Sequence, residues 1–415
     1  MIRRKLSAPT IYFIYIGVSA FLFDLVFTAN ELYRIEMAHF NPFQLVLVGT
    51  VLELSCFIFE IPTGILADLK SRKLSIIIGL MLIGLGFLIE GLFPSFIVIL
   101  ICQIIWGVGY TFTSGADEAW IADETGGKNL ERLFLKGAQI GQIGALLAII
   151  VSAVIGLFMI NLPLIIGGIL FIILGLFLLV NMPETNFKPL ATDERNSFHQ
   201  MINTFKLGVK SIKRKELLLI MLIISFFYGL YSEGLDRLWI AHVLNNISLD
   251  QIKIKPIIWV SLINGIAMIT SIIAVEYIKR KLKKTGQLQK VWLLILINLF
   301  MALSIIGFGL AQNFYFAFAT YLTFYILRIT NGPIYRSWLN ESIEPGVRAT
   351  VLSTYGQIDA MGQILSGPII GFIAFKASTS YSIIISGCIL LPAVLLYLVI
   401  LFKLKKGRIN QITKN

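Results

Sequence analysis

Long runs of apolar residues recur from one end of the chain to the other, separated by short polar segments. Each run holds about 20 residues or more, and at a rise of 1.5 Å per residue a helix of that length spans a hydrocarbon core of about 30 Å. The pattern therefore predicts twelve transmembrane helices, at about residues 10–32, 43–66, 74–93, 95–121, 134–158, 162–182, 217–241, 257–278, 290–310, 314–339, 350–375 and 380–402.

The widest polar interval runs from Pro183 to Glu216 and separates six predicted helices from six others. We expect a six-helix bundle over residues 1–183, a cytoplasmic central loop over 184–215, and a second six-helix bundle over 216–415. Apolar residues at helical spacing between 199 and 212 predict an interfacial helix within the loop.

The two halves of the chain resemble each other weakly. Trp120-Ile-Ala-Asp-Glu124 ends the fourth predicted helix, and Trp338-Leu-Asn-Glu341 ends the tenth. Such repetition is typical of transporters built from duplicated bundles, whose substrate site lies at mid-depth between the bundles. The expected fold class is an all-α membrane protein with twelve transmembrane helices in two pseudo-symmetric six-helix bundles.

Composition supports the membrane assignment, because 57% of the residues are apolar and 14% are charged, against about 25% charged in soluble domains. The net charge of +12 could suggest nucleic-acid binding, but its placement follows membrane topology. With the N-terminus inside, 29 of the 35 Lys and Arg lie on the cytoplasmic side; the others are four in outer loops (Arg34, Lys253, Lys255, Lys376) and two within helices (Arg237, Arg328). The positive-inside rule thus predicts both termini in the cytoplasm and no nucleic-acid partner.

Several classes of function are disfavoured by the residues that the chain lacks. His39, His199 and His242 are scattered, and no helix carries a metal-ligand cluster. No Gly-x4-Gly-Lys-Ser/Thr loop occurs, which argues against ATP-driven pumping by this chain alone. The three cysteines fall within predicted helices and do not suggest a disulfide framework. We expect no enzyme activity, no metal and no cofactor, with a proton gradient as the energy source.

The loop between the second and third predicted helices reads Gly64-Ile-Leu-Ala-Asp68-Leu-Lys-Ser-Arg72-Lys73. This segment, hereafter the signature loop, resembles the signature loop of the major facilitator superfamily, although that family often has a basic residue and a Gly at positions 69 and 71. Gly64 is expected to let two helices approach, and Asp68 to accept hydrogen bonds from a neighbouring helix N-terminus. Arg72 and Lys73 are expected to hold the loop at the anionic inner face. The resemblance implies that these residues gate the cytoplasmic side.

A second resemblance concerns the stretch from Glu53 to Asp68, together with Glu90 in the third helix. Two glutamates, the signature loop and a third glutamate are similar to the tetracycline-efflux proteins of Gram-positive anaerobes, and residues 114–124 to related macrolide- and drug-efflux carriers. This implies a drug:proton antiporter and antibiotic resistance. However, Gln103 stands where many drug antiporters have Arg, and their Gly-Pro motif is absent from the fifth helix.

The first half carries carboxylates at membrane depth. A charge there costs about 2.5–3.5 kcal/mol even on lenient scales, so it is kept where it lines a cavity, forms a pair or carries protons. Asp24 lies slightly outside the centre of the first helix and Glu53 near the centre of the second. Glu60 follows Glu53 by about two turns on the same face, which predicts a path for protons. A hydrogen-bonding role between helices stays open for all three, and Glu90 is expected to be solvated at the outer end of its helix.

The second half carries charges of both signs. Glu233 and Arg237 lie four residues apart in the order that favours a helix salt bridge, so a structural pair is predicted. Arg328 lies near the middle of the tenth helix and needs a carboxylate, which Glu233 or Asp236 could supply. Alternatively, Arg328 faces the cavity and binds an anionic group of the substrate. The candidates for proton coupling and the substrate cavity are Asp24, Glu53, Glu60, Arg328, Glu233 and Asp236.

The leading hypothesis is a secondary active transporter that exports small amphipathic drugs such as tetracycline by proton antiport and alternating access. The alternative is proton-coupled uptake of a small metabolite, for which Asn264, Asn298 and Asn331 would be expected to contact a polar, neutral substrate. A receptor that transports nothing is a third possibility. We expect a monomeric, multi-pass protein of the cell membrane whose partners are its small-molecule substrate, protons and lipid.

Overall fold

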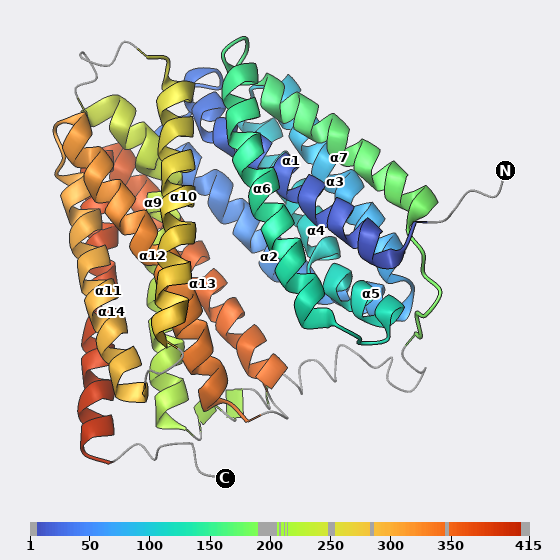
Figure 1. Cartoon of the computed structure of the whole chain (residues 1–415). Coiled ribbons are helices and arrows are strands. Elements are labelled where there is room, and N and C mark those ends of the chain that lie inside the picture. Colours follow the sequence, from blue (N-terminus) through green and yellow to red (C-terminus); the bar gives the residue numbers. More distant parts are fainter. Residues whose placement is uncertain are drawn as a thin grey trace. The chain divides into compact units, whose positions relative to one another are not determined.

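The computed structural model describes residues 6–189, 215–247, 254–282, 286–344 and 348–407, together with five positions between 206 and 213 (Figure 1). The long elements of this described part are all helices: α1 (Ala8–Glu36), α2 (Pro42–Leu69), α3 (Arg72–Leu92), α4 (Phe96–Thr113), α5 (Ala116–Thr125), α6 (Leu130–Gly156), α7 (Leu162–Asn181), α9 (Glu216–Asn246), α10 (Pro256–Leu282), α11 (Gln287–Gly309), α12 (Phe314–Ser342), α13 (Arg348–Lys376) and α14 (Thr379–Lys405). The all-α fold class is therefore confirmed.

Eleven segments of the described chain are long and apolar enough to cross a membrane, with α4 and α5 counted together as Phe96–Thr125. The twelfth long helix is α12, of 29 residues. Its second half carries Arg328, Asn331 and Arg336, which interrupt the apolar run. With α12 included, the twelve helices agree with those predicted.

The fourth predicted helix differs from the prediction because it is broken in two. Gly115 adopts φ +71°, in the left-handed region, and separates α4 from α5. Glycine adopts this conformation without steric penalty, and an apolar run does not reveal the break. Most of the interfacial helix predicted for residues 199–212 lies outside the described residues.

Several helices begin at polar residues that cap them. Ser71 Oγ accepts a hydrogen bond from the backbone nitrogen of Leu74 at 2.9 Å, and Asn313 Oδ1 accepts one from Phe316 at 2.9 Å. Ser378 does the same for Tyr381 at 3.2 Å. Each cap satisfies one of the backbone donors that a helix leaves unpaired at its start, which explains why the apolar segments begin where they do.

The chain divides into two compact units. The first comprises Met1–Phe40, Val51–Ser197 and Ile254–Gly265, and the second comprises Asn41–Thr50, Phe198–Lys253 and Ile266–Asn415. Helices α2 and α10 therefore contribute residues to both units, while each of the other described helices belongs to one.

The same pattern of helix packing occurs in each unit. In the first, the most extensive pairs are α1 with α6, α3 with α7, α3 with α4, and α1 with α7. In the second they are α9 with α13, α11 with α14, α11 with α12, and α9 with α14. These are the same four pairs when the six helices of each half are counted in order, so the internal repeat extends from sequence to packing.

Glycine permits the closest of these approaches. A Cβ atom at Gly168 of α7 would lie 2.5 Å from the backbone nitrogen of Leu88 in α3. In the second unit, a Cβ at Gly362 of α13 would lie 3.0 Å from the Cα of Gly229 in α9. Only a residue without a side chain fits at such contacts, as is common where helices associate in membranes.

Candidate functional site

An ion pair joins α9 to α12 within the second unit. Arg328 forms a bidentate contact with the carboxylate of Asp236, and the Nη2–Oδ2 distance is 2.7 Å. The two side chains are 33% and 39% exposed, so the pair is partly accessible. The guanidinium also lies over the rings of Tyr231 and Phe324, at 6.0 and 5.8 Å from their centroids. Of the two carboxylates considered for Arg328, Asp236 is therefore the one that pairs with it.

The second predicted pair is also present. Arg237 Nε lies 3.3 Å from Glu233 Oε1, four residues earlier on α9. Glu233 is almost fully buried, with its side chain 2% exposed. A Cβ atom at Gly49 would collide with both side chains, so the absence of a side chain there leaves room for the pair. This environment is typical of a structural pair.

A pocket of about 450 Å³ lies among α9, α12 and α13 of the second unit. Its polar lining consists of Ser225, Tyr228, Asn331, Tyr335, Arg336, Asn340, Tyr355 and Asp359. Asp359 is a half-buried carboxylate inside an apolar span, and it was not among the predicted site residues. The criterion that selected Glu53 also applies to Asp359, because it lies in the predicted helix 350–375.

Hydrogen bonds hold two of the predicted asparagines beside this pocket. Asn298 Nδ2 donates to Asn331 Oδ1 at 3.0 Å, and the Tyr228 hydroxyl lies 3.4 Å from the same oxygen. Tyr228 also shares a hydrogen bond of 2.9 Å with Tyr397. Of the three asparagines considered for a polar substrate, Asn331 lines the pocket and Asn298 supports it from behind, while Asn264 is not among the lining residues.

The carboxylates predicted for the first half all belong to the first unit. Asp24 is half-buried in α1, and its carbonyl oxygen accepts a hydrogen bond of 2.7 Å from Thr28. On α2, Glu53 is half-buried and Glu60 is exposed on the surface of the protein. Their roles in proton transfer stay predictions.

Glu90 is fully buried, so the interpretation of a solvated carboxylate is wrong. Arg34 of α1 lies 2.7 Å from Glu90 Oε1 and 2.9 Å from Glu31 Oε1. Gln103 of α4 donates to the other Glu90 oxygen at 2.9 Å and accepts from Trp106. The sequence predicted Arg34 in an outer loop. Helix α1 instead extends to Glu36, so Arg34 lies in the helix and is buried.

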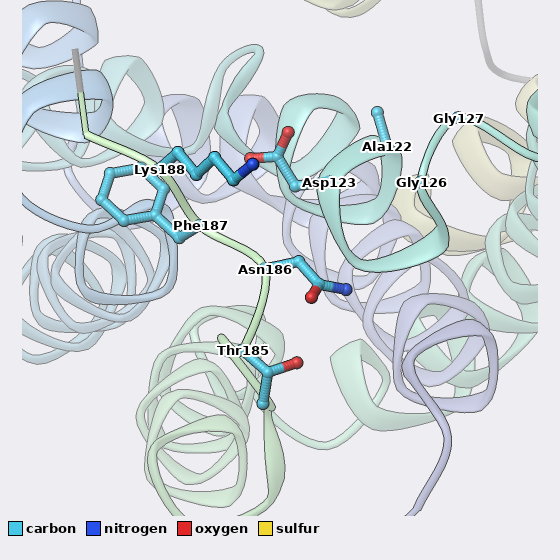
Figure 2. A pocket seen from close by; sticks show the side chains of 8 residues that line it. All are labelled: Ala122, Asp123, Gly126, Gly127, Thr185, Asn186, Phe187 and Lys188. Atoms are coloured by element: carbon cyan, nitrogen blue, oxygen red, sulfur yellow. The ribbon is translucent and has the colours of Figure 1, made fainter. Parts of the chain in front are cut away.

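The signature loop lies beside a shallow pocket of about 720 Å³ that is formed by the end of α5 and residues 185–188 (Figure 2). Gly126 and Gly127 line one side, and both have positive φ. Figure 2 shows the Lys188 side chain extending toward the carboxylate of Asp123. The pocket thus brings the start of the predicted central loop against the same carboxylate that the signature loop uses.

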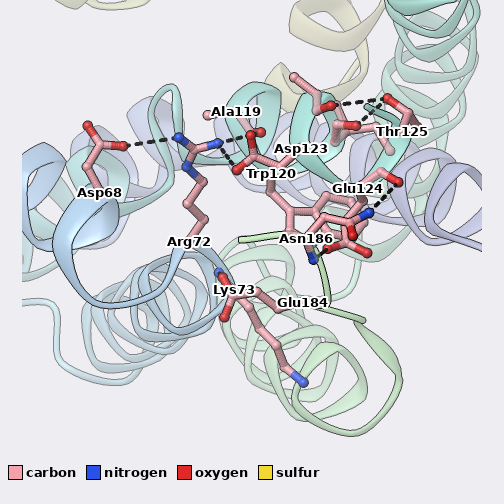
Figure 3. A network of polar contacts seen from close by, with 12 residues as sticks. Asp68, Arg72, Lys73, Ala119, Trp120, Asp123, Glu124, Thr125, Glu184 and Asn186 are labelled. Atoms are coloured by element: carbon pink, nitrogen blue, oxygen red, sulfur yellow. Dashed lines mark hydrogen bonds and ion pairs between the residues drawn. The ribbon is translucent and has the colours of Figure 1, made fainter. Parts of the chain in front are cut away.

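Arg72 connects the signature loop to α5 (Figure 3). It forms an ion pair with Asp123 and donates to the carbonyl oxygen of Ala119 at 2.7 Å. Asp68 lies farther away, at 3.5 Å from Arg72 Nη2. Asp123 was not predicted as the partner of Arg72, although it lies in the Trp120–Glu124 segment that marks the internal repeat.

The N-terminus of α3 is bound by Glu184 rather than by Asp68. Glu184 accepts from the Ser71 hydroxyl at 2.5 Å and from the Lys73 backbone nitrogen at 2.9 Å. Figure 3 shows Glu184 beside Lys73. Asp68 was predicted to accept hydrogen bonds from the N-terminus of a neighbouring helix. Its described partner is instead the side chain of Arg72. A carboxylate at this position is favoured by the backbone donors and the helix dipole.

Gly64 also differs from its expectation. A Cβ atom there would meet no atom of the described residues within 4 Å, so no close helix approach among them explains the glycine in this conformation. The gating role of Gly64, Asp68, Arg72 and Lys73 stays a prediction.

Comparison with known proteins agrees with this architecture. The sequence profile of the Major Facilitator Superfamily matches residues 11–358. The chain is 23% identical over 365 residues to the uncharacterized MFS-type transporter YxaM of Bacillus subtilis (strain 168), covering 86% of this chain and 87% of that protein.

Two solved structures show the same fold. The nucleoside transporter NupG superposes with a TM-score of 0.76 at 16% identity, covering 96% of this chain and 100% of that one. The peptide transporter POT in complex with sulfate superposes with a TM-score of 0.75 at 15% identity, covering 97% and 95%. Because the profile covers most of the sequence and the helix arrangement agrees, this chain belongs to the Major Facilitator Superfamily and is a membrane transporter.

Proposed function

We propose that this protein is a proton-coupled secondary active transporter that exports a small amphipathic compound, of which tetracycline is an example, by alternating access. The observation that carries this proposal is the pair between Arg328 and Asp236, which is about one-third exposed and joins two helices of 29 and 31 residues, each long enough to cross a membrane. A charged group in such surroundings is costly unless it is paired or solvated. Adding a proton to Asp236 would remove the partner of Arg328 and so change the energy of the whole site.

A second carboxylate can respond to that change. The charges of Arg328 and Asp236 both act on Asp359, which lines the neighbouring pocket. When Asp236 is protonated, Arg328 is free to interact more strongly with Asp359. A proton would thereby alter the pocket in which a substrate binds, which is the coupling that antiport requires.

The energy available is sufficient for useful accumulation. One proton moving down about 150 mV supplies about 3.5 kcal/mol, which corresponds to a gradient of a few hundred-fold. In this proposal Asp24, Glu53 and Glu60 are further proton acceptors of the first half, and Glu233, which pairs with Arg237, belongs to the charges of the same helix as Asp236. The signature loop gates the cytoplasmic side, both termini lie in the cytoplasm, and the protein works as a monomer in the cell membrane without a cofactor.

Transport by everted membrane vesicles tests the proposal. Vesicles that contain the protein should accumulate tetracycline when a proton gradient is imposed, and the accumulated compound should leak out when a protonophore collapses the gradient. Vesicles that contain the Asp236→Asn variant should accumulate no more than vesicles without the protein. Accumulation that survives the protonophore would refute proton coupling.

Uptake of a polar metabolite by proton symport is the second candidate. The observation that favours it is the hydrogen-bonded group of Asn298, Asn331 and Tyr228, of which Asn331 and Tyr228 line the pocket. Transporters of nucleosides and of peptides have the same fold. Uptake of labelled nucleosides and dipeptides into intact cells, with and without the gene, separates the two directions. Gene-dependent uptake would favour symport, whereas gene-dependent loss of preloaded tetracycline would favour export.

A further inference from the structure

The pocket among α9, α12 and α13 contains one acidic and one basic side chain. Asp359 enters it from α13 and Arg336 from α12. Among the residues that the structure describes, no ion pair joins the two, although the charge of Arg336 acts on Asp359. Two opposite charges that share a pocket without contact leave room for a molecule between them.

Each of the two groups is available to a ligand. Asp359 Oδ2 accepts a hydrogen bond of 2.9 Å from Gln363, one turn later on α13, which holds the carboxylate in place. Its other oxygen accepts no hydrogen bond within the described part of the chain. Arg336 is exposed, and its guanidinium offers a planar set of donors that matches a carboxylate.

Three tyrosines also line the pocket, and their hydroxyl groups are already used. The Tyr335 hydroxyl donates to the carbonyl oxygen of Met221 at 2.9 Å, and that of Tyr355 donates to Leu218 at 2.5 Å. Tyr228 shares its hydroxyl with Tyr397. These bonds fix the rings, so the tyrosines offer mainly apolar ring surface to a ligand.

We infer that this pocket binds a small amphipathic zwitterion, with its ammonium group at Asp359, its carboxylate at Arg336 and its apolar body against the tyrosine rings. A simple anion or cation would pair with one side chain and leave the other unpaired beside it, which is unfavourable in a partly buried site. The pocket volume of about 450 Å³ lies within the range of small-molecule sites. The inference rests on the proposed transport function and names the class of its substrate.

Binding to the purified full-length protein in detergent, without any gradient, tests the inference. The probes are L-phenylalanine, N-acetyl-L-phenylalanine, which lacks the cation, and L-phenylalaninamide, which lacks the anion, each titrated by calorimetry. The dipeptide glycyl-L-phenylalanine serves as a longer zwitterion. Charge-assisted hydrogen bonds are worth roughly 1.5–3 kcal/mol, so at least one of the zwitterions should bind about ten- to a hundred-fold more tightly than either derivative.

Two variants should give opposite patterns. Asp359→Asn should weaken zwitterion binding about ten-fold or more while leaving N-acetyl-L-phenylalanine unaffected. Arg336→Gln should weaken zwitterion binding similarly while leaving L-phenylalaninamide unaffected. Glu344→Gln and Arg348→Gln remove an acid and a base that are not among the lining residues, and both should bind as the unmodified protein does.

Three outcomes would overturn the inference: neither zwitterion binds at millimolar concentration, all three phenylalanine probes bind alike, or Asp359→Asn and Arg336→Gln weaken every probe equally. Because Arg336 is exposed, its variant reports on the pocket even where the Asp359 variant does not fold. Zwitterion binding without proton-dependent flux would refute the proposed function alone. Proton-dependent tetracycline flux in a protein that binds neither L-phenylalanine nor glycyl-L-phenylalanine would refute this inference alone.

Discussion

Lys290 donates hydrogen bonds to both carboxylate oxygens of Glu341, at 2.6 and 2.7 Å. The counterpart of this Lys290–Glu341 pair in the first half is the ion pair between Arg72 and Asp123. In both halves a basic residue in the first turns of a helix, α3 or α11, pairs with an acid at the end of the next span. Three residues before each acid stands a buried tryptophan, Trp120 or Trp338. The internal repeat is thus preserved in its ion pairs.

Replacing Glu341 with Gln should destabilise the second unit. Lys290 is 8% exposed and would lose the carboxylate that balances its charge. Because the Glu341 side chain is 42% exposed, solvent compensates in part, and we expect a loss of about 1–2 kcal/mol. The thermal denaturation midpoint in detergent should fall measurably. The control is Glu344→Gln, which removes the carboxylate that pairs with Lys215. Because Glu344 is more exposed than Glu341, this variant should change the denaturation midpoint little. A Glu341→Gln protein as stable as this control would contradict the assigned role.

Replacing Asp236 with Asn should abolish coupling more than binding. Arg328 keeps one hydrogen-bond acceptor but loses the charge that pairs with it, and Asn cannot take up a proton. We expect gradient-driven transport to fall at least ten-fold, while exchange of substrate at equal pH on both sides persists. The swapped variant Asp236→Arg with Arg328→Asp should recover part of the activity if the pair itself matters. Unchanged gradient-driven transport in Asp236→Asn would contradict a coupling role.

Replacing Glu90 with Ala should reduce stability rather than change energy coupling. Arg34 is 1% exposed and would lose its partner on α3. Breaking a buried ion pair costs about 3–5 kcal/mol, so the fraction of folded protein recovered by size-exclusion chromatography should drop sharply. Glu90→Gln should be milder because its amide oxygen still accepts a hydrogen bond. Folded Glu90→Ala protein with uncoupled transport would instead assign Glu90 to proton transfer.

Two helical glycines should respond oppositely to substitution by alanine. A Cβ at Gly168 would lie 2.5 Å from a backbone atom of α3, whereas a Cβ at Gly265 would meet none of the described atoms within 4 Å. Gly168→Ala should therefore lower stability by roughly 1–3 kcal/mol. Gly265→Ala should be neutral or stabilising by about 0.5–1 kcal/mol, because alanine favours the helix. Thermal denaturation of the two variants side by side makes the comparison, and equal effects would contradict the close packing of α3 and α7.

Much of the architecture could be predicted from the order of residues along the chain. Period and length of the apolar runs determine transmembrane helices, because lipid offers no hydrogen-bond partner to an exposed backbone. The pairing of Glu233 with Arg237 could be predicted as well, since the helix repeat brings residues four apart together. The duplication was visible in the segments that begin at Trp120 and Trp338.

Tertiary structure decided which distant groups meet. Asp236 rather than Glu233 pairs with Arg328, because the choice depends on how α9 packs against α12. Glu90 is buried because α1 continues beyond its predicted end and carries Arg34 to it. Glu184, distant in sequence from the signature loop, occupies the start of α3. These contacts depend on packing between helices, and a one-dimensional pattern of apolar and polar residues holds no information on it.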